Sequence, residues 1–120
     1  FINGPALINP QLNLKSHPNV FFAGQITGVE GYMESTAMGI LAARHIAASL
    51  ENRVESPPSP DTMMGALIRY ITETDPSIFQ PMNANFGLLD PPEKKMSKAD
   101  RKKWYAERAL NKAAEYANQV

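Results

Sequence analysis

The sequence predicts an α/β fold in which a buried strand, a glycine-rich turn and a long helix are followed by a mainly α-helical tail. The run from Val20 to Ala23 is short, apolar and made of good strand formers, which is typical of a strand buried on both faces. Gly24, Gly28 and Gly31 then allow a tight turn. From Met33 to Leu50 the pattern is helical and rich in small residues, so this helix can lie close to a neighbouring layer.

The residues before the strand predict extended segments and turns. Glycine and proline interrupt the apolar positions between Phe1 and Lys15, and Gln11 to Leu14 alternates as a short strand would. The stretch from Glu51 to Pro60 holds three prolines among serines and charges, which indicates a linker.

A second helix is expected from about Pro60 to Thr72, with Ser59 or Asp61 as its cap. The apolar residues of this helix recur at helical spacing and should belong to the core: Met64, Leu67, Ile68 and Ile71. Asp75 and Pro76 should end it.

The last third of the chain predicts an irregular segment and then a basic helix. Prolines and a glycine prevent a helix between Ile78 and Pro92, so we expect an extended packing segment there. Ser97 should cap the last helix, with Asp100 near its positive end. The expected apolar stripe of this helix comprises Ala106, Ala109, Leu110, Ala113 and Ala117. The predicted segments are therefore 1–56, 57–92 and 93–120.

Composition bounds the chemistry that these 120 residues can perform. The absence of cysteine excludes disulfides, thiolate metal sites and cysteine nucleophiles. His17 and His45, predicted as a turn residue and a helix-surface residue, are too few for a metal site. No apolar run reaches the length of a membrane span, and no signal peptide pattern opens the chain, so we expect a cytoplasmic location. The start at Phe1 favours a piece of a larger protein.

The formal net charge of zero hides an asymmetry. Residues 1–92 hold eight acidic and four basic side chains, a net charge of −4, whereas residues 93–120 hold four acidic and eight basic ones, a net charge of +4. A basic end on an otherwise acidic chain indicates an anionic partner at that end.

The turn from Gly24 to Ser35 is the strongest candidate for a ligand site. A strand, a glycine turn and a helix can direct free backbone N–H groups and the positive helix end at an electron-rich ligand. From spacing alone, an ordinary tight connection is the more frequent explanation, because lone glycine patterns are weakly specific.

The residues themselves carry a closer likeness. The motif Phe21-Phe-Ala-Gly-Gln-Ile-Thr-Gly-Val-Glu-Gly-Tyr-Met-Glu-Ser35 resembles the flavin motif of the folate- and FAD-dependent tRNA (uracil-5-)-methyltransferases, the TrmFO (Gid) family. Gly65 to Thr72, Phe79 to Leu89 and Tyr105 to Leu110 also resemble this family, so the likeness covers nearly the whole chain. A sister family that modifies the wobble uridine normally has Asn-Gly-Thr-Thr-Gly-Tyr at the turn, where this chain has Thr27 to Tyr32.

The resemblance implies the C-terminal portion of an FAD fold with two dinucleotide-binding domains. It implies an enzyme that methylates the T-loop uridine of tRNA at C5, with methylenetetrahydrofolate as carbon donor and NAD(P)H supplying electrons through FAD. The implied FAD contacts are Gly24, Gln25, Ile26, Thr27, Gly31, Tyr32 and Met33. The catalytic cysteines and the N-terminal diphosphate-binding motif of the family have no counterpart here, so the fragment should be inactive without the remaining N-terminal part.

The basic stretch is the candidate RNA surface. The residues expected to meet tRNA are Lys94, Lys95, Lys98, Arg101, Lys102 and Lys103. A solvated helix face is the alternative, but Trp104 and Tyr105 among the cations favour RNA. For the whole chain, the rivals are the wobble-uridine family and a non-catalytic module that binds RNA or protein.

Overall fold

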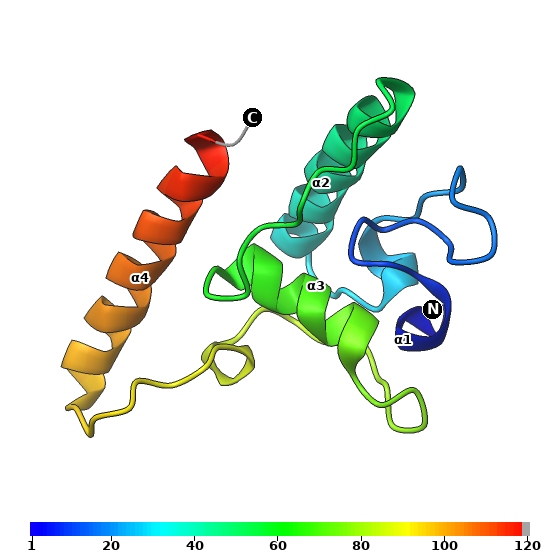
Figure 1. The fold of residues 1–120 in the computed structure, drawn as a ribbon. Coiled ribbons are helices and arrows are strands. Elements are labelled where there is room, and N and C mark those ends of the chain that lie inside the picture. The colour runs from blue at the N-terminus through cyan, green and yellow to red at the C-terminus, as the bar shows by residue number, and fades with distance from the viewer. Residues whose placement is uncertain (119–120) are drawn as a thin grey trace.

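The structure is a computed structural model that describes residues 1–118, and it is helical (Figure 1). Its helices are α1 (Gly4–Leu7), α2 (Tyr32–Leu50), α3 (Met63–Glu73) and α4 (Lys98–Asn118). Two short 3-10 turns, η1 (Gly24–Thr27) and η2 (Phe86–Leu88), lie between them. Within residues 1–118 the only β-structure consists of isolated bridges, so the expected α/β character is not seen in this part of the fold.

The predicted buried strand from Val20 to Ala23 is wrong for the described chain. Phe21 makes a single antiparallel bridge with Asn13, and Val20 is 38% exposed. The expected alternating strand near Leu14 is likewise reduced to isolated bridges. A parallel strand needs backbone partners along its edges, and the described residues offer this run only the short stretch 12–14.

The long helix after the glycine turn is confirmed, since α2 begins one residue before the predicted start and ends at Leu50. Its inner face is regular: Met38, Leu41, Ala42, His45 and Ala48 are buried. These positions follow the helical repeat, which places them along one side of the helix.

The second predicted helix forms as α3, but its cap differs from the prediction. Thr62, rather than Ser59 or Asp61, precedes the helix, and its hydroxyl accepts a hydrogen bond from the Gly65 N–H at 3.1 Å. The Ser59 carbonyl instead accepts from the Thr62 N–H, which places residues 59–62 in a turn before the helix. The helix ends at Glu73, as Asp75 and Pro76 predicted.

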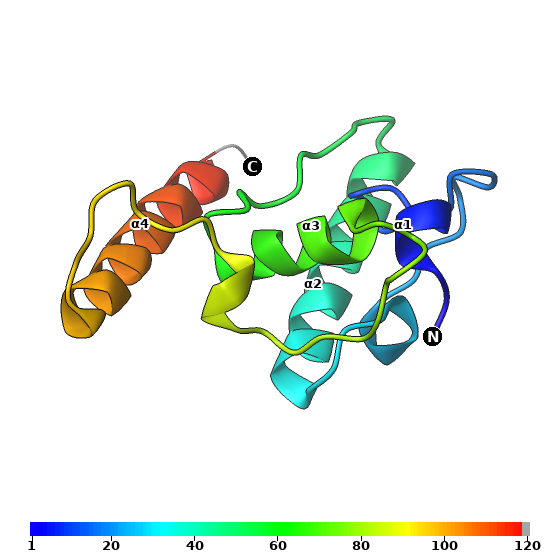
Figure 2. The same ribbon diagram turned by 90° about the horizontal axis from the view of Figure 1, so that it is seen from below.

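One buried cluster joins the first two predicted segments. Its members are Ile8, Leu12, Val29, Met38, Leu41, Ala42, Leu67, Ile68, Ile71 and Phe79. The expected core residues of α3 are therefore confirmed, with Met64 packed at the edge of the cluster. Figures 1 and 2 show α3 running across α2, with α1 beside α3. The helical turn α1 was missed, although Pro5 in its first turn favours such a start.

Helix α4 stands apart from this core and reaches it through one face (Figures 1 and 2). Tyr105 packs with Ala66 and Leu89, and Arg108 pairs with Asp61 at 3.5 Å. The Ser97 cap is confirmed, because its hydroxyl accepts from the Asp100 N–H at 3.2 Å.

The predicted alanine stripe of α4 does not form the packed face. Leu110 is 70% exposed, and Ala106, Ala113 and Ala117 are exposed with it. The aromatic side chains and Arg108 bury more surface per residue than alanine does, so they determine how the helix docks. None of the helices described between residues 1 and 118 is both long and apolar enough to cross a membrane.

Candidate functional site

The glycine turn is held from inside by its own backbone and by one hydroxyl. Gly24 has φ of 81° and Gly28 has φ of 94°, both in the left-handed region that favours glycine. The Thr27 hydroxyl donates to the Gly24 carbonyl at 2.7 Å, and Thr27 is fully buried. Thr27 is one of the expected cofactor contacts, but its side chain is used to close the turn.

A second segment fixes the turn from behind. Glu30 N–H donates to the Met82 carbonyl at 3.0 Å, and Met82 N–H donates to the Gly28 carbonyl at 2.9 Å. The Asn83 side-chain amide donates to the Glu30 carbonyl at 3.0 Å. These bonds place residues 82–83 against the glycine turn, so the irregular segment is part of the architecture of the candidate site.

Helix α2 begins with free backbone donors. Gly31, with φ of 106°, is its cap residue and provides no side-chain hydrogen bond. The first helical bond within the described residues runs from Ser35 N–H to the Gly31 carbonyl, which leaves the amides of residues 32–34 without helical acceptors. Tyr32 is 96% exposed and Met33 is 81% exposed, so these donors lie at the surface. The positive end of α2 is therefore open to an anion or an electron-rich group.

The Glu34 carboxylate lies beside the cap residue Gly31. A Cβ atom placed on Gly31 would lie 1.6 Å from Glu34 Oε2, so the carboxylate fills the space beside the cap residue. A negative charge at this position stabilises the helix start by about 0.3–1 kcal/mol.

A cavity of about 450 Å³ adjoins the turn. It is lined by Phe1, Gln25, Ile26, Glu30 and Pro81. Gln25 and Ile26 are both exposed, as expected for cofactor contacts, and the Ile26 carbonyl accepts from Ile2 N–H at 2.9 Å. The free amides of residues 32–34 are donors of the kind that fit the electron-rich edge of a flavin ring.

The six expected RNA contacts are all exposed: Lys94, Lys95, Lys98, Arg101, Lys102 and Lys103. Lys98, Arg101 and Lys102 line a cavity of about 360 Å³ together with Phe86, Gly87 and Tyr105. In contrast, Arg108 does not line this cavity. Its guanidinium carbon lies 4.3 Å from the ring centroid of Trp104 on the same helix, and its pair with Asp61 joins α4 to the turn before α3. Of the two side chains that dock the helix, Tyr105 therefore borders the basic surface and Arg108 does not.

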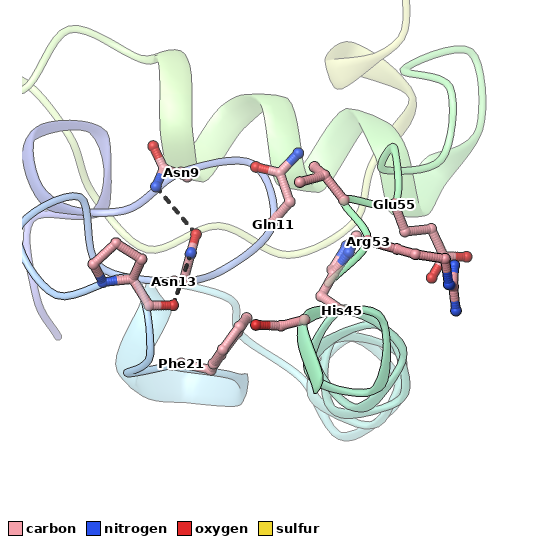
Figure 3. Close-up of a pocket in the computed structure, with 10 residues that line it drawn as sticks. Asn9, Gln11, Asn13, Phe21, His45, Arg53 and Glu55 are labelled. Carbon is pink, nitrogen blue, oxygen red and sulfur yellow. Dashed lines mark hydrogen bonds between the residues drawn. The ribbon is translucent and has the colours of Figure 1, made fainter. Parts of the chain in front are cut away.

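A third cavity contains a residue that sequence reasoning misplaced. His45 is 3% exposed, so its prediction as a helix-surface residue is wrong. It lies with Asn9, Asn13 and Phe21 around a cavity of about 260 Å³ (Figure 3). Neither ring nitrogen has a hydrogen-bond partner within residues 1–118.

Burial lowers the pKa of the His45 imidazole, an effect that the nearby Glu55 carboxylate opposes, and the ring is therefore neutral near pH 7. Its spacing from Met38 and Leu41 was the signal that could have placed it on the buried face of α2.

Comparison with known proteins gives the family. A family described as "Glucose inhibited division protein A" matches residues 1–54. A protein of Syntrophus aciditrophicus is 49% identical over 120 residues, which is all of this chain. Proteins of Sphingopyxis alaskensis and Syntrophomonas wolfei are 51% and 49% identical over 97% and 100% of the chain. All three carry the name methylenetetrahydrofolate--tRNA-(uracil-5-)-methyltransferase TrmFO. The chain belongs to the TrmFO family.

The chain spans only about a quarter of the length of these TrmFO relatives, at 27%, 26% and 28%. The family prediction is confirmed at the level of homology. The expected C-terminal position within a TrmFO protein is not supported by these matches. The assignment of flavin and RNA contacts to particular residues stays a prediction.

Proposed function

We propose that this chain is part of a flavoenzyme that methylates the T-loop uridine of tRNA at C5. In this proposal methylenetetrahydrofolate provides the carbon, and NAD(P)H provides electrons through FAD. The names of the TrmFO relatives support the tRNA and folate chemistry. The observation that carries the proposal for this chain is the open amide end of α2 beside the exposed glycine turn. The proposal does not depend on which end of the enzyme these residues form.

Bound FAD would supply two-electron transfer at the turn. The amides of residues 32–34 would donate to the pyrimidine edge of the isoalloxazine, where negative charge accumulates on reduction. These donors are fixed before the ligand arrives, because Gly31 and the Met82 bonds set their direction. Ile26 offers an apolar wall and Gln25 a neutral hydrogen-bonding side chain. No residue of this chain is assigned a catalytic role.

The basic surface would hold the tRNA. Phosphate contacts from the exposed cations at 94–103 would give affinity and salt dependence without sequence choice. The acidic remainder of the chain would disfavour RNA elsewhere, which directs the substrate to this end.

The test uses the full-length protein that contains these residues. We expect it to purify with bound flavin, seen in its absorbance spectrum, and to form 5-methyluridine in the T-loop, seen by mass spectrometry of digested tRNA. Formation of modified wobble uridine instead would favour the sister family. A colourless protein that binds tRNA without modifying it would favour the non-catalytic module.

A further inference from the structure

The cavity between η2 and the first turns of α4 combines an exposed aromatic ring with three cations. Its volume is about 360 Å³. The chain leaves η2 and runs outward through residues 89–97 to the start of α4 (Figure 1). The two walls therefore come from segments that are close in sequence but belong to different elements.

The aromatic ring is Phe86, and it lies on a buried support. Its ring stacks on that of Tyr105, with centroids 5.5 Å apart and an interplanar angle of 26°. Tyr105 is 7% exposed and packs with Ala66 and Leu89, whereas Phe86 is 49% exposed. Phe86 is thus a half-exposed aromatic residue, and apolar area left in water costs about 25 cal/mol per Å².

The backbone holds Phe86 in this position. The Asn85 side-chain oxygen accepts from Gly87 N–H at 2.9 Å, and the Leu89 N–H donates to the Phe86 carbonyl at 3.1 Å. The Asn85 side-chain amide also donates to the Asn83 carbonyl at 2.9 Å. A ring fixed in this way can accept a stacking partner with little loss of conformational freedom.

The cations form the other wall. Lys98, Arg101 and Lys102 are spaced i, i+3 and i+4, so they lie on the same face of α4. None of them makes an ion pair in the part of the chain that the structure describes, and no acidic side chain lines the cavity. Their charge is therefore available to a ligand. The neighbouring Lys103 is also exposed but does not line the cavity.

We infer that this cavity binds one unpaired nucleotide of RNA, with its base stacked on Phe86 and its flanking phosphates at Lys98, Arg101 and Lys102. An aromatic face beside cations is the arrangement that binds single strands, because every base can stack and every nucleotide carries a phosphate. A base within a duplex has no free face to offer. This inference rests on the proposed tRNA substrate and adds a subsite that prefers unpaired RNA.

The test measures, by fluorescence anisotropy, how tightly the full-length protein binds two labelled probes. One is an oligouridine of about eight nucleotides, and the other is an abasic ribose-phosphate strand of the same length. Phe86→Ala should weaken binding of the oligouridine about tenfold, the effect typical of one lost base stack, and leave the abasic probe unchanged. Lys102→Gln should weaken both probes and lower the salt slope by about 0.7, the value for one phosphate on a single strand.

Two control variants separate stacking and local charge from general effects. Phe86→Leu keeps an apolar contact with Tyr105 but has no aromatic face, so it should behave as Phe86→Ala does with oligouridine. Lys15→Gln removes an exposed charge outside the basic stretch and should keep the parent salt slope. Unchanged far-UV circular dichroism should accompany every variant.

Equal weakening of both probes by Phe86→Ala, no weakening of either, or an absence of oligouridine binding by the parent chain would overturn the inference. Such a result would leave the proposed function standing if the full-length protein still formed 5-methyluridine. Loss of that modification would contradict the proposed function independently of Phe86.

Discussion

The glycine turn before α2 and the basic surface at the start of α4 are presented by different means. The turn is fixed by backbone geometry, through Gly28 with its positive φ and through the paired bonds to Met82. Helix α4 is held by side chains, chiefly Tyr105 and Arg108. The first region should respond sharply to added atoms on glycine, whereas the second should respond to removal of single side chains while the core stays folded.

The largest effect is expected at Gly28. A Cβ atom there would lie 2.5 Å from Cζ of the buried Phe79 ring, and φ is 94°. Strained backbone and overpacking together should lower the free energy of unfolding of Gly28→Ala by about 3 kcal/mol, measured by urea denaturation. Gly39→Ala is the matched control, because nothing lies within 4 Å of its added Cβ in the middle of α2. It should stabilise by about 0.5–1 kcal/mol, and similar losses in both variants would show that the turn is not backbone-fixed.

The next effect concerns the docking of α4. Arg108→Ala removes the partly buried pair with Asp61, which joins α4 to the turn before α3, and should weaken docking of the helix by about 2 kcal/mol. Hydrogen exchange should then speed up in α4 while α2 and α3 keep their protection. Arg101→Ala, on the same helix but exposed, should leave exchange unchanged. Faster exchange throughout the chain would mean that α4 and the core unfold together.

A smaller effect should follow pH through His45. Burial lowers the pKa of its imidazole, so the unfolded chain binds the proton more tightly than the folded one. Stability is then complete above the unfolded pKa of about 6.5 and falls with acidification by up to about 1.4 kcal/mol per pH unit. His45→Leu should remove this decline, whereas His17→Gln, at an exposed position, should retain it. An identical acid profile in parent and His45→Leu would assign the decline to other groups.

The sequence could predict features that depend on neighbouring residues, but not those that depend on contacts with distant segments. Helix α2, the Ser97 cap and the core positions of α3 depend on neighbours three or four residues away, which local periodicity reveals. The prediction of a strand from Val20 to Ala23 was wrong, because a strand forms only when other segments provide backbone partners. The predicted packing face of α4 was wrong for a related reason. Asp61, Ala66 and Leu89, from elsewhere in the chain, contact Tyr105 and Arg108 and so select them over the alanines.

Some features of the candidate site could likewise be predicted from the sequence, and others could not. Its residue types and its glycines are local features, so Gly24 to Met33 could be chosen from the motif. The bond from Asn83 to Glu30 joins distant parts of the chain, and the stacking of Phe86 on Tyr105 joins two separate elements. Nothing in the spacing of these residues shows which side chains will meet, so these contacts required the structure.

The last and smallest change in stability tests the cofactor assignment at the start of α2. Gly31 has φ of 106°, so Gly31→Ala should cost about 1 kcal/mol of folding stability while the half-buried Glu34 side chain moves aside. Rotating the cap should also turn the amides of residues 32–34 away from the flavin, so the full-length variant should retain less FAD, measured by absorbance after purification. Glu34→Ala removes only the carboxylate beside Gly31 and leaves the glycine cap unchanged. It should cost a similar or smaller amount of stability, about 0.3–1 kcal/mol, yet retain FAD at least as well as the parent. Equal FAD content in all three proteins would show that the helix start lies away from the flavin.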